Sequence, residues 1–275
     1  MTTDATPTIE LFALTDAGKV RNHNEDSVFV DPALGLAVLA DGMGGYNAGE
    51  VASGMATSSL GSGLGKAFVG RVPGERLPAG GYWAHEAITR EISCANDVIY
   101  RAAQSQPQYS GMGTTLVMAL FYGDTLTAAH LGDSRLYRLR DDDFQQITRD
   151  HSLLQEQLDS GMISADEARQ SLNRNLVTRA LGVDPAVEAE ICDYPLHAGD
   201  IYLLCSDGLN DMVDDDDIAL TLRSLSANLG LCATQLVTMA NDNGGRDNVS
   251  VILARVNRVA PQPGTWWQRL LDWLK

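Results

Sequence analysis

The chain has 275 residues, of which 44% are hydrophobic, and it carries a formal net charge of −16. Such an acidic chain argues against nucleic acids and anionic membranes as partners, because both are bound through basic patches. No signal peptide and no apolar run of transmembrane length is visible, so the sequence predicts a cytoplasmic protein. The length allows a single domain, since two-layer β folds often reach about 200–250 residues.

The first third of the chain predicts strands followed by two long helices. Residues 1–8 are polar and are expected to be loosely held. Apolar runs bounded by turn residues are typical of strands, and three of them follow: 9–15, 27–30 and 34–40. Helical spacing of apolar residues then predicts helices at 47–64 and 83–103. We expect three glycines to end the first of these helices: Gly61, Gly63 and Gly65.

Strands in close succession fill the middle of the chain. Two- or three-residue turns join them, which indicates antiparallel pairing; they are expected at 112–121, 125–131, 135–140 and 144–148. The segment 150–182 interrupts the series, because it is polar and broken by Gly161. Further strands and helices follow: strands at 189–194, 200–205 and 249–256, and helices at 218–225 and 233–241. This order predicts an α+β fold with helices layered over a sheet.

Residues 259–275 are expected to form a proline-containing linker and an amphipathic C-terminal helix. Tryptophans and leucines of 266–275 fall on one arc of a helical wheel, and polar residues fall on the other. A helix of about ten residues is roughly 15 Å long, too short to span a bilayer. Because so short a helix is marginal alone in water, it is expected to dock on its own domain, on a partner protein or on a membrane surface.

Acidic residues stand beside glycines or other small residues at the ends of predicted strands. Asp41 follows 34–40, Asp133 follows 125–131, Asp207 follows 200–205, and Asp247 precedes 249–256. A single Asp-Gly pair is usually only a turn, but its repetition favours a site. Gathered carboxylates stay ionised together only where cations neutralise them, and oxygen ligands select Mg²⁺ or Mn²⁺. Two such ions about 3.5–4 Å apart activate water for an in-line displacement at phosphorus.

Six motifs carry a resemblance to a known family. They are Arg21–Asp26 (RNHNED), Asp41–Gly45 (DGMGG), Gly113–Thr115 (GTT), Gly132–Arg135 (GDSR), Ser206–Gly208 (SDG) and Gly245–Asn248 (GRDN). Their order and spacing resemble those of the metal-dependent protein phosphatases, the type 2C serine/threonine phosphatases, and the DGMGG form resembles the bacterial branch. The match covers roughly residues 9–256.

The resemblance implies a fold and a domain organisation. The fold would be an α+β sandwich of two stacked antiparallel β-sheets flanked by pairs of helices. Residues 9–258 would form the phosphatase catalytic domain, and 150–182 would be its flap, a lid beside the metal site that shapes substrate choice. From the residues alone, a solvated helical insertion fits that segment equally well.

The resemblance also implies a ligand set for Mn²⁺ or Mg²⁺. Asp41 would bridge two ions, and the Gly42 carbonyl would help to hold the second. Asp207 and Asp247 would complete the ligands of the first ion. Bacterial members also suggest a third, weaker ion, which Asp133 would hold together with Asp207.

Residues of the RNHNED motif would act around these ions. Arg21 would hold the phosphate, because a guanidinium offers a planar fork to phosphate oxygens; without the resemblance, an exposed loop arginine fits as well. Glu25 and Asp26 would hold metal-bound waters in the outer shell. Animal relatives have a histidine at the Met43 position, proposed to protonate the leaving group, which methionine cannot do. A metal-bound water is the first alternative and His23 the second; the remaining histidines are expected to be structural or on the surface: His85, His130, His151 and His197.

The implied activity is metal-dependent hydrolysis of phosphoserine and phosphothreonine on proteins by a water that bridges the ions, without a phosphoenzyme. Phosphorylated proteins would be the substrates, and a cognate serine/threonine kinase would be the counterpart. A catalytically silent, phosphatase-like binding module is one alternative, although it would have no chemical need for four metal carboxylates. A phosphohydrolase of small phosphate esters is the other alternative.

Overall fold

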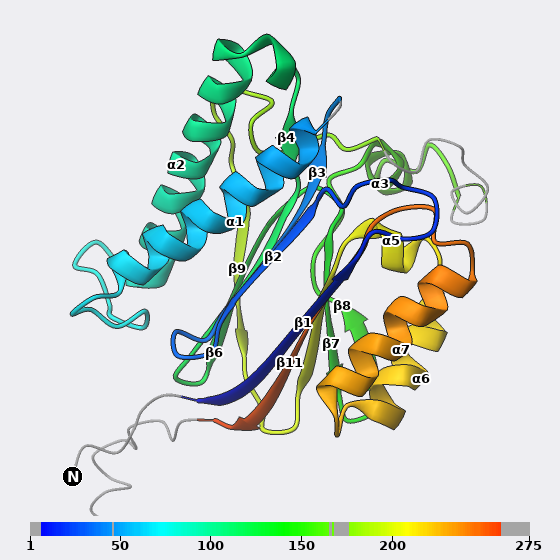
Figure 1. Ribbon diagram of the computed structural model, residues 1–275. Helices are drawn as coiled ribbons and strands as arrows, with labels where there is room; N and C mark the ends of the chain where they lie inside the picture. Colours follow the sequence, from blue (N-terminus) through cyan, green and yellow to red (C-terminus); the bar gives the residue numbers. More distant parts are fainter. Residues whose placement is uncertain (1–6, 46, 165–166, 168–175, 260–275) are drawn as a thin grey trace, which may run out of the picture.

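A computed structural model describes residues 7–45, 47–164, 167 and 176–259 of the chain. Two antiparallel β-sheets lie face to face, and helices cover the outer side of each sheet (Figure 1). The predicted α+β sandwich is therefore confirmed. The predicted amphipathic segment 266–275 and residues 1–6 lie outside the described part of the chain.

The five-stranded sheet brings three distant loops to one of its ends. Its strands follow the order β1 (Thr8–Asp16), β11 (Val249–Arg258), β10 (Ile201–Cys205), β7 (Arg135–Arg140) and β8 (Asp143–Gln146). Strand β11 lies between β1 and β10 and pairs antiparallel with both, with Asp16 opposite Val249 and Cys205 opposite Val251. The end of β1, the start of β11 and the end of β10 therefore lie together at one end of the sheet.

The six-stranded sheet contributes further acidic residues at the same end of the sandwich. Its main path follows the order β2 (Asp26–Asp31), β3 (Leu36–Met43), β5 (Leu116–Tyr122), β6 (Thr125–Leu131) and β9 (Glu190–Pro195), and the short β4 (Gly113–Thr114) pairs with the end of β3. The antiparallel register of β2 and β3 sets Asp26 opposite Asp41. Two acidic residues on consecutive strands thus become neighbours through strand pairing.

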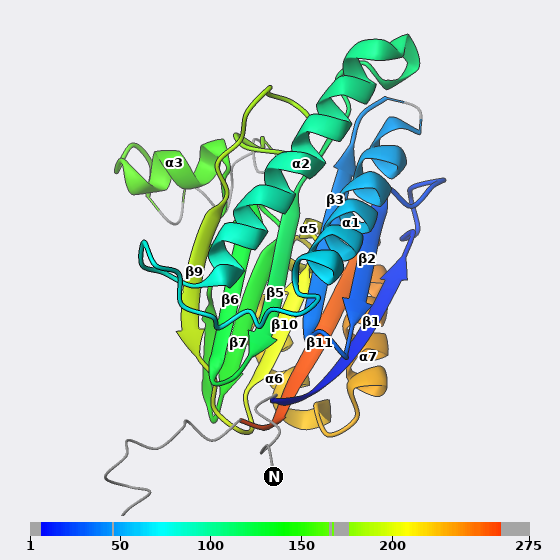
Figure 2. The ribbon, with the colours of Figure 1, turned by 90° about the vertical axis from the view of Figure 1, so that its left-hand side faces the viewer.

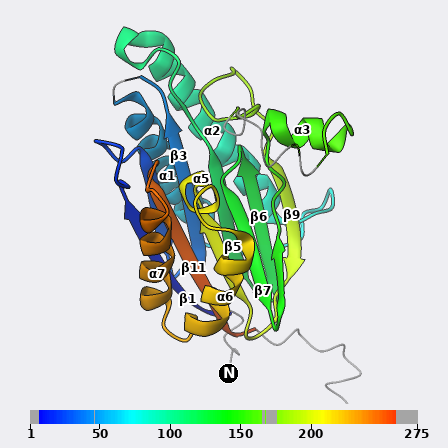
Figure 3. The ribbon, with the colours of Figure 1, turned by 90° about the vertical axis from the view of Figure 1, so that its right-hand side faces the viewer.

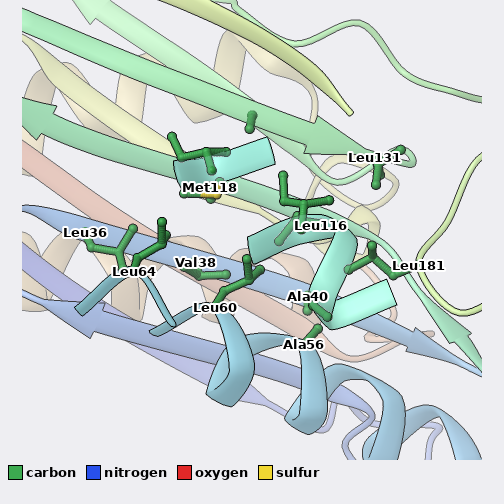
Figure 4. Close-up of a cluster of buried hydrophobic side chains, with 14 of the residues drawn as sticks. Leu36, Val38, Ala40, Ala56, Leu60, Leu64, Leu116, Met118, Leu131 and Leu181 are labelled. Atoms are coloured by element: carbon green, nitrogen blue, oxygen red, sulfur yellow. The ribbon is translucent and has the colours of Figure 1, made fainter. Parts of the chain in front are cut away.

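Helices α1 (Ala48–Ala67) and α2 (Trp83–Ser105) cover the outer face of the six-stranded sheet (Figure 2). Their apolar faces form one buried cluster with β3, β5 and β6. In this cluster Leu60 and Leu64 of α1 lie beside Leu36 and Val38 of β3 (Figure 4). Burial of these side chains fixes α1, and with it the loop at the end of β3.

The prediction that glycines end the first helix is wrong, because α1 runs through them to Ala67. A Cβ atom on Gly61 would lie 2.7 Å from the ring of Phe29, and one on Gly63 would lie 2.1 Å from the carboxylate of Glu91 on α2. These glycines let the helix approach its neighbours closely. The cost of glycine in a helix, about 1 kcal/mol each, is offset by packing.

Helices α6 (Asp215–Leu225) and α7 (Leu229–Asp242) cover the outer face of the five-stranded sheet (Figure 3). Acidic residues fill the first turn of α6, as expected from the favourable interaction of carboxylates with the positive end of a helix dipole. Helix α7 starts four residues earlier than predicted, because the Asn228 side chain accepts a hydrogen bond from the Leu231 amide and caps it.

A third apolar cluster fills the space between the two sheets. The remaining helical elements are short: η1 (Pro107–Tyr109), α3 (Leu153–Asp159) and α5 (Asp207–Asn210). Both α3 and α5 lie at the end of the sandwich where β3 ends (Figure 1). No helix in the described ranges combines the length and the apolar character needed to cross a membrane.

Candidate metal and phosphate site

Carboxylates from both sheets gather at the end of the sandwich where β3 and β10 end and β11 begins. Asp41 lies on β3 near its end, Asp133 follows β6, Asp207 follows β10 and Asp247 precedes β11. Burial raises the pKa of Asp41 well above its ordinary value, and the nearby carboxylates of Asp26, Asp207, Asp133 and Asp247 raise it further. The structure therefore brings together the four aspartates that the sequence singled out as metal ligands.

Strand pairing and one serine position Asp26 within the cluster. The Ser206 hydroxyl, at the end of β10, donates a hydrogen bond of 2.8 Å to Asp26 Oδ2. Asp26 is 8% exposed, and its Oδ1 has no hydrogen-bond partner among the described residues. Burial raises the pKa of Asp26 to about 6. A buried carboxylate oxygen without a partner is a ready acceptor for a bound water or a cation.

Burial and neighbouring carboxylates raise the pKa values of Asp207 and Asp133 as well. Burial and the carboxylates of Asp133, Asp211 and Asp247 raise the pKa of Asp207 well above its ordinary value. Burial, followed by the neighbouring Asp150, raises the pKa of Asp133 to about 6. Without a counter-ion these groups disfavour one another's charge. The donor set, made of carboxylate oxygens, fits a hard divalent cation that would neutralise them.

Gly42 lies where the backbone must pass very close to two neighbours. A Cβ atom at this position would lie 2.1 Å from the Gly49 carbonyl oxygen of α1 and 2.6 Å from the Glu25 carbonyl oxygen. The Gly42 amide also donates to the Glu25 carbonyl at 3.1 Å. Only glycine fits here, so β3, α1 and the loop bearing Glu25 are locked together beside Asp41.

The GTT motif holds the backbone of Asp41. The Thr115 hydroxyl accepts a hydrogen bond of 3.0 Å from the Asp41 amide, and the Thr114 hydroxyl donates one of 2.8 Å to the Asp41 carbonyl. The Thr115 hydroxyl also lies 2.7 Å from that of Ser134, next to Asp133. The two threonines are therefore structural supports of the carboxylate cluster.

Arg21 lies at the rim of the cluster. Its Nη2 donates a hydrogen bond of 2.7 Å to Asp247 Oδ2, and both side chains remain partly open to solvent. This hydrogen bond raises the pKa of Arg21, and the charges of Glu25 and Asp207 act in the same direction. His23 is exposed, and its backbone carbonyl accepts a hydrogen bond from Asn248.

One group of possible metal ligands near the cluster was not predicted from the sequence. Ligand atoms of His130, His151 and Glu190 lie within 4.8 Å of one another, and no other such group was found among the described residues. Glu190 faces His130 across the pairing of β6 with β9, and no sequence signal foretold that pairing.

The hydrogen bonds of the two histidines nevertheless favour a structural role. His130 Nε2 lies 2.8 Å from the Arg149 carbonyl, so this nitrogen carries the proton. His151 Nδ1 accepts from the Gly132 amide at 3.2 Å, so a neutral ring carries its proton on Nε2. Burial, with further contributions from His130 and Arg179, lowers the pKa of His151 to about 4. A metal ion on His151 Nε2 would have to break the bond to Gly132.

A known protein family matches most of the chain. The sequence profile of the family described as Protein phosphatase 2C matches residues 18–239. The chain belongs to the protein phosphatase 2C family. The resemblance inferred from the six motifs is thereby confirmed.

Bacterial relatives match most of this phosphatase 2C chain. It is 39% identical over 249 residues to the serine/threonine phosphatase stp of Listeria welshimeri, across 88% of the chain and 94% of the relative. It is also similar to the crystal structure of the Mycobacterium tuberculosis serine/threonine phosphatase PstP/Ppp, with a TM-score of 0.79, 38% identity, and coverage of 91% and 99%. The catalytic domain of PstP in complex with two manganese ions matches with a TM-score of 0.77, 38% identity, and coverage of 90% and 97%.

Proposed function

We propose that this phosphatase 2C chain hydrolyses phosphoserine and phosphothreonine esters on proteins with the help of bound Mn²⁺ or Mg²⁺. The observation that carries the proposal is the cluster of buried aspartates with Arg21 at its rim. The names of its relatives as serine/threonine phosphatases, and the two manganese ions of the PstP structure, support the same activity.

The aspartates are proposed to hold two ions. Asp41 would bridge them with help from the Gly42 carbonyl, and Asp207 and Asp247 would complete the ligands of one. A third, weaker ion would be held by Asp133 together with Asp207. The raised pKa values of Asp41, Asp133 and Asp207 support this assignment, because a cation would remove the repulsion that causes them.

Two acidic residues are proposed to hold the water around the ions. Asp26 is suited to this role by the oxygen that has no partner among the described residues. Glu25 is suited by its position, since its carboxylate lies against Gly49, which itself packs against Gly42. Two divalent ions, when bound close together, supply an activated water and neutralise the charge that develops during in-line displacement at phosphorus.

The chain's own residues would orient the substrate. A guanidinium has five N–H donors, and the ion pair of Arg21 with Asp247 uses one of them, so others remain for phosphate oxygens. Met43 has no proton to give to the leaving alcohol. A metal-bound water or, as the second choice, the exposed His23 would supply it. A steep loss of turnover in His23→Ala at unchanged metal affinity would identify the histidine.

The decisive experiment is an assay on three substrates with and without chelator. We expect turnover of a phosphothreonine peptide in millimolar Mn²⁺ or Mg²⁺ and none in excess EDTA, because oxygen sites of this kind bind such ions weakly. A nucleotide and a sugar phosphate should be poor substrates. Full activity in EDTA would overturn the metal assignment. Preference for the small esters, or no turnover of any substrate with metal, would favour one of the two alternatives.

The segment 150–182 is proposed to be a substrate-contacting flap. Met162 is 76% exposed, which leaves its side chain available for a peptide. We expect Met162→Ala to lower kcat/KM for a phosphopeptide on the order of three- to tenfold through lost apolar contact. Turnover of a small aryl phosphate should not change. Val98→Ala, on an exposed part of α2, is the matched control, and equal losses on both substrates would assign the flap residue to support of the metal site.

Partners follow from the chemistry of the proposed substrate. Phosphoserine and phosphothreonine arise by phosphoryl transfer to a hydroxyl group, so a serine/threonine kinase is the proposed counterpart in the cytoplasm. Deleting a kinase that phosphorylates the same proteins should remove the substrate pool. Docking of residues 260–275 on the domain or on a partner also remains a proposal, and deletion of that segment should then change the melting temperature or partner binding.

A further inference from the structure

The loop between β1 and β2 carries two residues of the proposed site but contains no helix or strand of its own. Arg21 and Glu25 both lie on it. Such a loop needs external contacts to hold an arginine in place against the entropy of a free chain. The principal contact is Asn248, which immediately precedes β11 and is 5% exposed.

The Asn248 side chain ties the two ends of this loop together. Its Oδ1 accepts a hydrogen bond of 2.8 Å from the Glu25 amide. Its Nδ2 donates to the Ala17 carbonyl at 3.0 Å and to the His23 carbonyl at 2.9 Å. One amide donor and two carbonyl acceptors fix the orientation of the side-chain amide, because the flipped amide would set donor against donor.

The Asn248 backbone positions the partner of Arg21. The Asn248 amide donates a hydrogen bond of 2.9 Å to Asp247 Oδ1, while Asp247 Oδ2 accepts from Arg21 at 2.7 Å. One residue therefore holds both the loop that carries the arginine and the carboxylate that the arginine contacts.

Gly18 allows the start of the same loop to pack closely against the backbone of Asp247. It has φ +75°, and a Cβ atom there would lie 2.2 Å from the Asp247 carbonyl oxygen. The amides of Lys19 and Val20, next along the loop, donate to the Gly245 carbonyl at 2.8 and 3.1 Å. The loop is thus pressed against residues 245–248 with no room for a side chain between them.

We propose that Asn248 is a positioning residue that sets phosphate affinity by holding the 17–25 loop, and with it Arg21, beside the carboxylate cluster. This inference rests on the proposed function, because it takes Arg21 to be the phosphate-binding group. A guanidinium displaced from its site loses charge-assisted hydrogen bonds to phosphate. The effect should fall on KM and on inhibition by inorganic phosphate more than on kcat.

A double-mutant cycle with Arg21 tests the proposal. Asn248→Ala and Arg21→Ala are each expected to raise KM for a phosphopeptide, and the inhibition constant of inorganic phosphate, about tenfold or more at saturating Mn²⁺. In the Arg21→Ala background, Asn248→Ala should add at most about twofold, since coupled residues are not additive. The Mn²⁺ concentration for half-activation is measured for each variant, to separate a metal defect from a phosphate defect.

Hydrogen exchange gives a readout that does not depend on turnover. In Asn248→Ala the amides of 17–25 should exchange at least tenfold faster, while those of β11 and α7 keep their protection. Gly18→Ala should likewise raise KM and the phosphate inhibition constant and speed the exchange of the 17–25 amides, although Asn248 is unchanged. Gly70→Ala is the matched control, because Gly70 has the same φ of +75° and a Cβ atom there would meet nothing within 4 Å.

The outcomes separate this inference from the function on which it rests. If Arg21→Ala leaves KM and phosphate inhibition unchanged, the proposed role of Arg21 fails. If Arg21→Ala raises both and Asn248→Ala raises neither, or adds its full effect in the Arg21→Ala background, only the positioning role fails. Exchange that rises across the whole chain in both Asn248→Ala and Gly18→Ala would mark a general structural role and overturn the proposal.

Discussion

Asp41→Asn is expected to lower kcat/KM for a phosphothreonine peptide on the order of a hundredfold or more, with the fold retained. Asparagine keeps the shape of the side chain and one acceptor oxygen, but it loses the negative charge that would serve two ions. The backbone contacts of Asp41 with Thr114 and Thr115 do not involve its side chain, so the melting temperature in EDTA should not fall. Steady-state kinetics and thermal unfolding together check this expectation.

A second carboxylate and a distant one supply the controls for Asp41→Asn. Asp247→Asn should also be severe at limiting Mn²⁺ but should recover in part at high Mn²⁺, because Asp247 is proposed to serve one ion only. Asp97→Asn, an exposed position on α2 paired with Arg101, should keep full activity. Near-normal turnover of Asp41→Asn at low Mn²⁺ would remove Asp41 from the bridging position.

Local pattern was sufficient to locate the aspartates. Each stands at the end of an apolar run beside small residues, and strand ends are recognisable from sequence because their boundaries depend on nearby residues. The pairing of distant strands was not recognisable. Nothing in the apolar run of β11 says that it inserts between β1 and β10, and that insertion is what sets Asp247 beside Arg21.

Contacts that depend on tertiary packing were the ones missed. Gly61 and Gly63 were expected to end a helix because glycine is a poor helix former, yet close packing against Phe29 and Glu91 outweighs this preference. Asn248 was visible as part of a motif, but its three hydrogen bonds reach residues more than 220 positions away. The group formed by His130, His151 and Glu190 likewise depends on strand pairing.

Buried acidic groups should make the protein without bound metal less stable at neutral pH. Burial raises the pKa of Asp133 to about 6 in the folded chain, above its ordinary value of 3.8, and it raises the pKa of Asp26 to about 6 as well. Folding therefore favours the protonated form. The stability that these groups contribute is fully present below about pH 4 and is lost as the pH rises through about 6. At pH 7.5 both groups are ionised at a cost to folding.

Asp133→Asn is accordingly expected to stabilise the protein in EDTA at pH 7.5 by about 1–3 kcal/mol, since one pKa unit corresponds to about 1.4 kcal/mol. The gain should shrink as the pH falls through 6 and vanish near pH 4, where Asp133 is protonated. Added Mn²⁺ should reverse the order, because a cation that binds only the folded state stabilises the wild type more. Urea unfolding across pH 4–8 measures these differences. Equal stabilities at pH 7.5 in EDTA would show that Asp133 carries no buried charge.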